Sequence, residues 1–182
     1  MALSIDLHGH LALVTGSTGE LGRVLANTLA KAGADLALHV RRESTAAQAL
    51  QAKIQAQGRR AAIFPADIGD PGSIQHMRAA IAAALGAPSI VVINAVQQIH
   101  PWSSVLDESI EDYESQLRTC VLQSVGLAKA FVPAMIERGW GRVVGINSEC
   151  AALCGPSQSA YVAGKRGMRC LAKVEIVRPV HC

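Results

Sequence analysis

The stretch LALVTGSTGELG, residues 11–22, decides the fold of this chain. Residues 11–15 are a short apolar run that predicts a buried strand, and glycines follow it at once. Residues 21–32 have a helical pattern, and Gly33 favours a helix end there. A strand that passes through glycines into a helix is the arrangement of a dinucleotide-binding turn, because glycines let the backbone approach a pyrophosphate and the helix amino terminus attracts it. Such turns also join strands to helices where nothing binds, so this motif needs support from the rest of the chain.

The alternation of apolar runs and helical patterns continues along the whole chain. Further strands are predicted at residues 35–40, 61–64, 90–93 and 142–146, and further helices at 44–57, after 72, at about 110–137 and from 159. This rhythm is typical of a parallel sheet with helices on both faces. We therefore predict an α/β protein with one doubly wound, Rossmann-type domain over residues 1–182, three layers (α/β/α) and the strand order 3-2-1-4-5.

The composition predicts a core of small aliphatic side chains. Half of the residues (50%) are hydrophobic, but only 3% are aromatic. Such a core suits thin helices packed closely on buried strands. In the first helix the helical period places five side chains on one apolar face: Leu21, Val24, Leu25, Thr28 and Leu29.

Charge and composition exclude several classes of function. The formal net charge is +3 and the basic clusters are no longer than Arg41-Arg42 or Arg59-Arg60, so we expect no nucleic-acid partner. The five cysteines contain no Cys-x-x-Cys pair and the six histidines are scattered, which predicts neither a metal site nor a disulfide framework. No signal peptide is visible, and Gly86 and Pro88 interrupt the most apolar segment, residues 79–96. We expect a cytoplasmic protein without a membrane partner.

The turn at residues 15–22 resembles the TGxxxGxG motif of the short-chain dehydrogenase/reductase family. Its spacing, Gly16-x-x-Gly19-x-x-Gly22, is closer to that of the family's extended members. The resemblance implies a nicotinamide cofactor on this turn. Glu20 stands where the motif has a glycine, and we expect its carboxylate to turn away from the pyrophosphate. The residues that the resemblance assigns to the cofactor here are Gly16, Ser17, Thr18, Gly19, Leu21 and Gly22.

The end of the second strand selects between NAD and NADP, because an acid there binds the ribose 2′-hydroxyl whereas a base pairs with a 2′-phosphate. The sequence reads HVRRE at residues 39–43, with no acid where NAD-dependent relatives carry one. We therefore expect NADPH to be preferred over NADH, with Arg41 and Arg42 at the phosphate. The alternative interpretation is a solvated basic loop.

Two further segments carry the resemblance on the cofactor side. Asp67 and Ile68 follow the third strand, and by resemblance Asp67 hydrogen-bonds the adenine amino group. After the fourth strand, the family's Asn-Asn-Ala-Gly motif is replaced by Ile93-Asn94-Ala95-Val96. We expect Asn94 and Ala95 to contribute to the cofactor turn and Val96 to narrow the space beside it.

The residues that carry the chemistry are Ser148, Tyr161 and Lys165. Tyr161 and Lys165 are four positions apart, so both project from one face of the last helix. Ser148 is expected to close the fifth strand, and its distance of thirteen residues from the tyrosine is the family's own. A free phenol is too weak an acid to serve as a base at neutral pH, and a nearby ammonium stabilises the tyrosinate. Tyr161 is thus the candidate acid/base, while by resemblance Lys165 and Tyr161 also contact the cofactor and Ser148 orients the substrate oxygen.

The sequence departs from the family at two places near this site. The asparagine of the family's fourth helix, which supports a water in the proton relay, aligns with Cys120, and a thiol is a poor substitute for it. The chain ends at Cys182, where relatives continue, and Arg178-Pro179-Val180 does not match their Pro-Gly loop. We expect the strand at 142–146 to have a bare edge as a result, and the chain to self-associate as a dimer or tetramer.

The sequence therefore leaves two alternative hypotheses for the function. The first is an oxidoreductase that transfers hydride between NADP(H) and a small carbonyl or secondary alcohol. The second is a dinucleotide-binding or oligomerising scaffold with little turnover, which Cys120, Val96 and the lack of the family's C-terminal part favour.

Overall fold

The computed structural model of the chain describes residues 5–97 and 103–174. Contacts between residues divide the chain into two compact units, Met1–Ala95 with Gly126–Ile146, and Val96–Val125 with Asn147–Cys182. The expectation of a single domain stays a prediction. The mismatch at Arg178-Pro179-Val180 lies outside the described residues.

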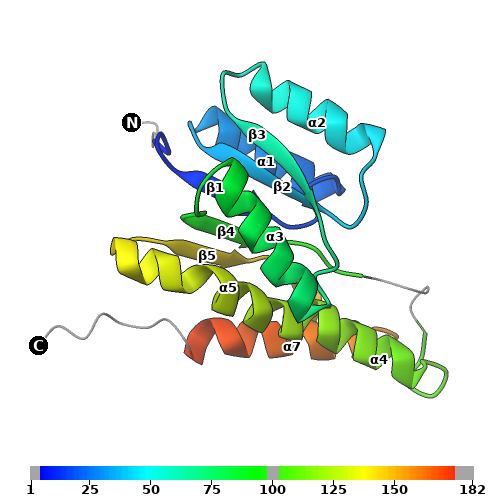
Figure 1. Cartoon of the computed structure of the whole chain (residues 1–182). Helices are drawn as coiled ribbons and strands as arrows, with labels where there is room; N and C mark the ends of the chain where they lie inside the picture. Colours follow the sequence, from blue (N-terminus) through cyan, green and yellow to red (C-terminus); the bar gives the residue numbers. More distant parts are fainter. Residues whose placement is uncertain (1–4, 98–102, 175–182) are drawn as a thin grey trace, which may run out of the picture. The chain divides into compact units, whose positions relative to one another are not determined.

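The first unit is built on a five-stranded parallel sheet with the order β3-β2-β1-β4-β5 (Figure 1). This confirms the predicted fold class, a Rossmann-type α/β sheet flanked by helices. The central strand β1 is hydrogen-bonded on both sides, with Leu13 opposite Ala37 of one neighbour and Val91 of the other. The strands are β1 (Leu11–Val14), β2 (Asp35–Val40), β3 (Ala61–Pro65), β4 (Ile90–Ile93) and β5 (Arg142–Gly145).

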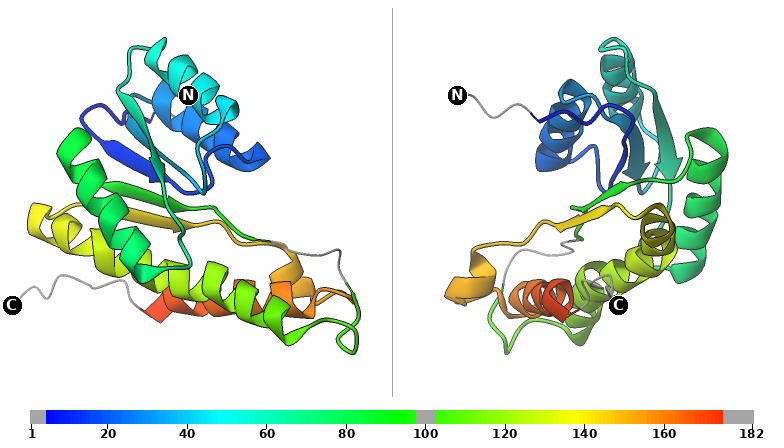
Figure 2. Two further views of the ribbon diagram at one scale, coloured as in Figure 1. Left: turned by 45° about the vertical axis from the view of Figure 1, so that its right-hand side comes forward. Right: turned by 90° about the vertical axis from the view of Figure 1, so that its left-hand side faces the viewer.

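Helices cover both faces of this sheet (Figure 2). On one face lie α1 (Glu20–Lys31) and α2 (Thr45–Gln55), and α3 (Pro71–Ala84) lies on the other, joined there by the later part of α5 (Gln123–Arg138). Side-chain caps set where two of them begin. The Ser44 hydroxyl accepts a hydrogen bond from the Ala47 N–H at the start of α2, and the Asp70 carboxylate accepts one from Ser73 N–H at the start of α3.

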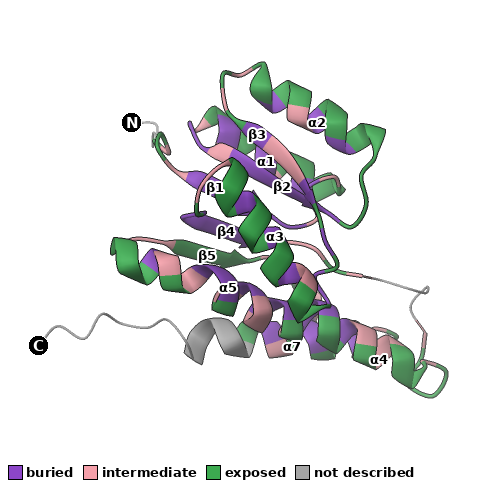
Figure 3. Ribbon diagram, in the orientation of Figure 1, coloured by how far each residue is buried: buried purple, intermediate pink, exposed green. Residues whose placement is uncertain are grey.

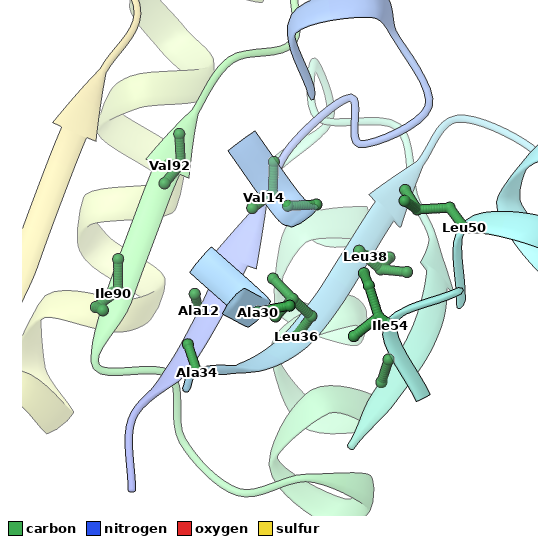
Figure 4. Packing of buried hydrophobic residues seen from close by; sticks show 12 residues of the cluster. Ala12, Val14, Ala30, Ala34, Leu36, Leu38, Leu50, Ile54, Ile90 and Val92 are labelled. Atoms are coloured by element: carbon green, nitrogen blue, oxygen red, sulfur yellow. The ribbon is translucent and has the colours of Figure 1, made fainter. Parts of the chain in front are cut away.

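Small side chains bring α1 close to the sheet. Ala26 and Ala30 are buried in the same core cluster as Ala12 and Leu36. Figure 4 shows Ala30 beside the two strand residues. The predicted apolar face of this helix is therefore wrong in part: Leu25 and Leu29 pack against this core, but Leu21 and Val24 are 47% and 60% exposed. The close approach depends on the small residues Gly22, Ala26 and Ala30. Larger side chains on that face would hold the helix away from the strands.

The second unit contains the start of a long helix and two later helices. The long helix begins as α4 (Ile110–Gln116), passes through a π-helical segment η1 (Leu117–Leu122) and continues as α5. Its predicted range of about 110–137 is confirmed to within one residue at each end. The short helix α6 (Cys150–Leu153) and the π-helical segment were not predicted. The last helix, α7 (Ser159–Val174), begins where expected.

One helix of the described residues, Ile110–Arg138, is long and apolar enough to cross a membrane, with a mean hydropathy of 1.5 over its most apolar window. Core helices of soluble proteins satisfy the same two criteria, so this is weak evidence. The segment 79–96 that seemed most apolar in the sequence forms the end of α3, a turn and β4, as predicted.

Candidate active site

The glycine turn leads from β1 into α1 in the first unit. Gly16 has φ +63°, a left-handed conformation that favours glycine. At Gly22 a Cβ atom would lie 2.1 Å from the carbonyl oxygen of Gly16, so only glycine allows the helix to begin so close to the turn. Glu20 is exposed on the first turn of α1, consistent with a carboxylate that points to solvent. The turn has the strand-to-helix geometry that brings backbone N–H groups toward a phosphate.

Thr15 and Asn94 hold this turn to the end of β4. The Thr15 hydroxyl donates to the Val92 carbonyl (3.3 Å) and accepts from the backbone N–H groups of Asn94 (2.9 Å) and Ala95 (3.0 Å). The Asn94 amide donates in return to the carbonyls of Thr15 (3.0 Å) and Gly16 (3.3 Å). Asn94 and Ala95 therefore lie beside the glycine turn, as expected. Thr15 was quoted in the motif, but its role had no separate signal in the sequence.

Ser17 and His39 form a second set of contacts within the turn. Ser17 is fully buried, and both its N–H and its hydroxyl donate to the His39 carbonyl at 3.0 Å. The His39 ring lies between the Gly16 N–H (3.1 Å from Nδ1) and the Ala66 carbonyl (3.0 Å from Nε2). The side chain of Ser17 thus stabilises the turn itself. Sequence reasoning missed His39, whose only signal was a polar residue within a buried strand.

The other residues assigned to the cofactor line the same end of the sheet at varied depths. Arg41 and Arg42 are exposed directly after β2. After β3, Asp67 is exposed and its carboxylate accepts from the Gly69 N–H (2.8 Å), while Ile68 is buried. The turn residues assigned to the cofactor that remain at least partly exposed are Gly16, Thr18, Gly19 and Leu21.

Tyr161 and Lys165 lie in the second unit, one helical turn apart on α7. The Lys165 ammonium nitrogen is 5.8 Å from the centroid of the Tyr161 ring. Lys165 is only 3% exposed, and burial lowers the pKa of its ammonium while the nearby Cys120 opposes that shift. The structure therefore brings together the phenol and the ammonium that the sequence paired.

Ser148 lies beyond the fifth strand and not at its end. β5 ends at Gly145, and Ser148 belongs to the loop before α6 and to the same unit as α7. The Ser148 hydroxyl oxygen accepts from the Cys150 N–H (3.3 Å), and this contact does not use the hydroxyl proton. Asn147 joins this loop to α7, because its amide donates to the Lys165 carbonyl (3.0 Å) and accepts from the Ser148 N–H (2.8 Å). Sequence reasoning did not find Asn147.

The first turn of α7 is held by a carboxylate that is distant in sequence. Glu108 accepts from the Ser159 hydroxyl (2.8 Å) and from the Ala160 N–H (3.4 Å). Tyr113 lies 2.5 Å from the same Ser159 oxygen, and since the serine proton is directed to Glu108, Tyr113 is the donor. A negative charge at a helix amino terminus is stabilising, so Glu108 fixes the turn that carries Tyr161.

Cys120 lies in the π-helical segment, where functional sites often interrupt a helix. It is 1% exposed and its thiol donates only a long contact, 3.8 Å, to the side-chain oxygen of Gln116. Burial raises the pKa of the thiol, and Lys165 opposes the shift. A protonated, buried thiol is a weak participant in a proton relay, in line with the expectation from the sequence.

Residues 10–175 match the family described as short chain dehydrogenase, and the chain belongs to this family. D-beta-hydroxybutyrate dehydrogenase of Rhizobium meliloti (strain 1021) is 31% identical over 163 residues, which cover 89% of this chain and 62% of that protein. Fatty acyl-CoA reductase of Acinetobacter baylyi (strain ATCC 33305 / BD413 / ADP1) is 29% identical over 171 residues, which cover 92% of this chain and 58% of that protein. The chain thus spans about three fifths of the length of these relatives.

Among solved structures, the fold is similar to that of L-sorbose reductase from Gluconobacter frateurii complexed with NADPH and L-sorbose. The TM-score is 0.86 at 23% sequence identity, over 94% of this chain and 64% of that one. At this identity the similarity shows the fold. A further relative, L-rhamnose 1-dehydrogenase (NAD(P)(+)) of Sphingomonas sp. (strain SKA58), is 30% identical over 91% of this chain and 65% of that protein.

Proposed function

We propose that the chain is an NADP(H)-dependent oxidoreductase that interconverts a small carbonyl compound and a secondary alcohol. The observation that carries this proposal is the buried Lys165 ammonium at 5.8 Å from the Tyr161 ring centroid. A buried charge is costly, and its position beside a phenol fits a proton-transfer site better than a surface decoration. Membership of the short-chain dehydrogenase family supports the same reaction class.

The glycine turn fits a dinucleotide. The Gly16 carbonyl lies too close to residue 22 for any side chain there, and such a tight, glycine-dependent turn is what a dinucleotide-binding motif requires. Arg41 and Arg42 stand exposed after β2, where we propose that they bind the 2′-phosphate and so favour NADPH over NADH. Asp67 has one carboxylate oxygen that accepts from Gly69, and we propose that the other is available to the adenine amino group.

Three side chains and the cofactor have separate roles in the proposed reaction. The bound nicotinamide supplies or accepts the hydride. Tyr161 gives a proton to the substrate oxygen in reduction and removes it in oxidation, and the Lys165 ammonium stabilises the tyrosinate in between. Ser148 donates a hydrogen bond from its hydroxyl to the same oxygen and holds the carbonyl in place.

The role of Tyr161 is tested by Tyr161→Phe. The variant is expected to lower kcat/KM for carbonyl reduction at least about a hundredfold, because only the proton donor is lost. Its Kd for NADPH should stay within about threefold of wild type. Steady-state NADPH oxidation with a panel of ketones and aldehydes, and fluorescence titration of NADPH, give the two readouts. Tyr113→Phe is the matched control: it removes the hydroxyl next to Ser159 and should cost far less turnover.

The cofactor preference is tested by Arg41→Ala. The wild type is expected to bind NADPH more tightly than NADH, and the variant should lose about tenfold in affinity for NADPH alone, because NADH lacks the phosphate. Arg78→Ala, which changes an exposed arginine of α3, is the control. Equal affinities of the wild type for both cofactors would contradict the preference.

One observation favours the second candidate function, a dinucleotide-binding scaffold with little turnover. Cys120 occupies the relay position and is buried with a long contact to Gln116. Tight NADPH binding without turnover of any carbonyl or alcohol in the panel would support the scaffold.

Three cysteines of the described residues, Cys120, Cys150 and Cys154, are free thiols, and on this ground we propose a reducing, cytoplasmic location.

A further inference from the structure

His39 is a buried histidine on β2 whose two ring nitrogens both have partners. The residue is 2% exposed. Its Nδ1 is 3.1 Å from the backbone nitrogen of Gly16, which has only a proton to give, so Nδ1 is the acceptor. Its Nε2 is 3.0 Å from the carbonyl oxygen of Ala66, which has only lone pairs to give, so Nε2 is the donor. The two contacts therefore assign His39 to the neutral tautomer with the proton on Nε2.

The partners of His39 come from two separate segments at the carboxyl end of the sheet. Gly16 belongs to the glycine turn after β1, and Ala66 directly precedes Asp67 after β3. The backbone carbonyl of His39 also accepts from the N–H and hydroxyl of Ser17. A single side chain on the strand between them thus joins the proposed pyrophosphate turn to the proposed adenine segment.

The charge around His39 is consistent with a neutral ring. Burial lowers the pKa of its imidazole, while the hydrogen bond to the Ala66 carbonyl and the carboxylate of Asp67 oppose that shift. The glycine turn faces the ring with the uncharged groups Gly16 and Ser17. Arg41 and Arg42, on the continuation of its own strand, are exposed. A second proton on Nδ1 would point at the Gly16 N–H and remove the bond that holds the turn.

We propose that His39 is a positioning residue of the cofactor site, which as a neutral Nε2–H imidazole presets the Gly16 amide and hence the turn that receives the pyrophosphate. This inference rests on the proposed function. Gly16 is the residue with φ +63°, so the bond to Nδ1 acts at the point where the turn departs from ordinary backbone geometry. A turn that is already ordered binds the pyrophosphate without the entropic cost of ordering its backbone first.

Two variants separate the two ring nitrogens. In His39→Asn the side-chain oxygen takes the place of Nδ1 and keeps an acceptor for Gly16. In His39→Gln the side-chain nitrogen takes the place of Nε2 and keeps a donor for Ala66 alone. Each variant leaves one buried group unpaired, so both should melt at similarly reduced temperatures. Fluorescence titration is expected to show NADPH affinity within about threefold of wild type for His39→Asn and at least about tenfold weaker for His39→Gln.

A pH series supplies a readout that does not depend on the cofactor. Since the folded chain favours neutral His39, the unfolded chain binds the extra proton first, and the stability due to this group is lost as the pH falls below the ordinary value of 6.5. Thermal melts should show this loss in wild type, and a smaller one in His39→Asn. Wild type that binds neither NADPH nor NADH overturns the proposed function and the inference with it. Binding that both variants weaken equally, or equal pH slopes, overturns the positioning role alone.

Discussion

Lys165 combines its proposed catalytic role with a cost to the stability of the fold. Its burial lowers the pKa of the ammonium, so the charged form is less favoured in the folded chain than in the unfolded chain. The unfolded chain therefore binds more protons between the lowered folded pKa and the ordinary value of 10.5. Stability is lost as the pH falls through this window, and at neutral pH the residue reduces the free energy of unfolding.

Lys165→Met is accordingly expected to raise the free energy of unfolding by about 1 kcal/mol near neutral pH, because it removes a buried charge and keeps the volume. Turnover should fall by at least about a hundredfold, because the tyrosinate loses its cation. Thermal melts and steady-state assays measure the two effects. Lys129→Met, on the exposed side of α5, is the control and should change neither. A destabilised Lys165→Met would show that contacts of the ammonium outweigh its desolvation.

At the scale of elements, the packing of α7 depends on two glycines that face the long helix. A Cβ at Gly164 would lie 2.9 Å from the backbone carbonyl oxygen of Gln116, whereas a Cβ at Gly167 would meet a methyl carbon of Val121 at 2.6 Å. A backbone group cannot turn away, but the end of a side chain can. The two positions therefore differ in what a single methyl group must displace.

Gly164→Ala is expected to lower the free energy of unfolding by about 1–3 kcal/mol, because it forces α7 away from α4 and η1. Gly167→Ala should be nearly neutral, since the gain of about 1 kcal/mol in helix propensity offsets the shift of Val121. Turnover should fall in the first variant more than in the second, because α7 carries Tyr161 and Lys165. Chemical denaturation with parallel assays measures both. Equal effects of the two substitutions would contradict this account of the packing.

The sequence predicts those elements that depend on local pattern and misses those set by packing. Strands 35–40 and 90–93 are confirmed residue for residue, because a short, mainly apolar run between turn residues leaves a buried strand few alternatives. The buried face of α1 was predicted only in part, because helical periodicity marks large apolar side chains such as Leu25 and Leu29 and not the small ones that a close approach selects. The π-helical segment at Leu117–Leu122 has no breaker in its sequence.

The candidate site shows the same division. Tyr161 and Lys165 follow from their spacing in a helix, because one face of one element holds both. Asn147 and His39 act through contacts with carbonyl or amide groups 18 and 23 residues away in sequence, which no local pattern records. The sequence identifies groups that react, whereas most of the groups that position them appear only with the fold.

At the scale of the whole molecule, the edge of the sheet is the feature with the widest consequence. β5 is the last strand of the order, and in the described part of the chain no strand pairs with its outer edge. The strand is exposed along its length, with Val143 and Val144 at 43% and 46% (Figure 3). Only Arg142, at its start, carries a charge that discourages pairing.

We therefore predict that residues 1–182, expressed alone, self-associate through this edge, and that Val144→Lys shifts the chain toward monomer. A lysine in the middle of an edge strand must bring its charge into any new strand pair, which opposes pairing. Size-exclusion chromatography with light scattering, over a range of concentrations, measures the change. Val24→Lys adds the same charge at an exposed position of α1 and should leave association unchanged. A wild-type chain that is a monodisperse monomer with a sharp, high melting transition would show that the edge is protected, and this prediction would be wrong.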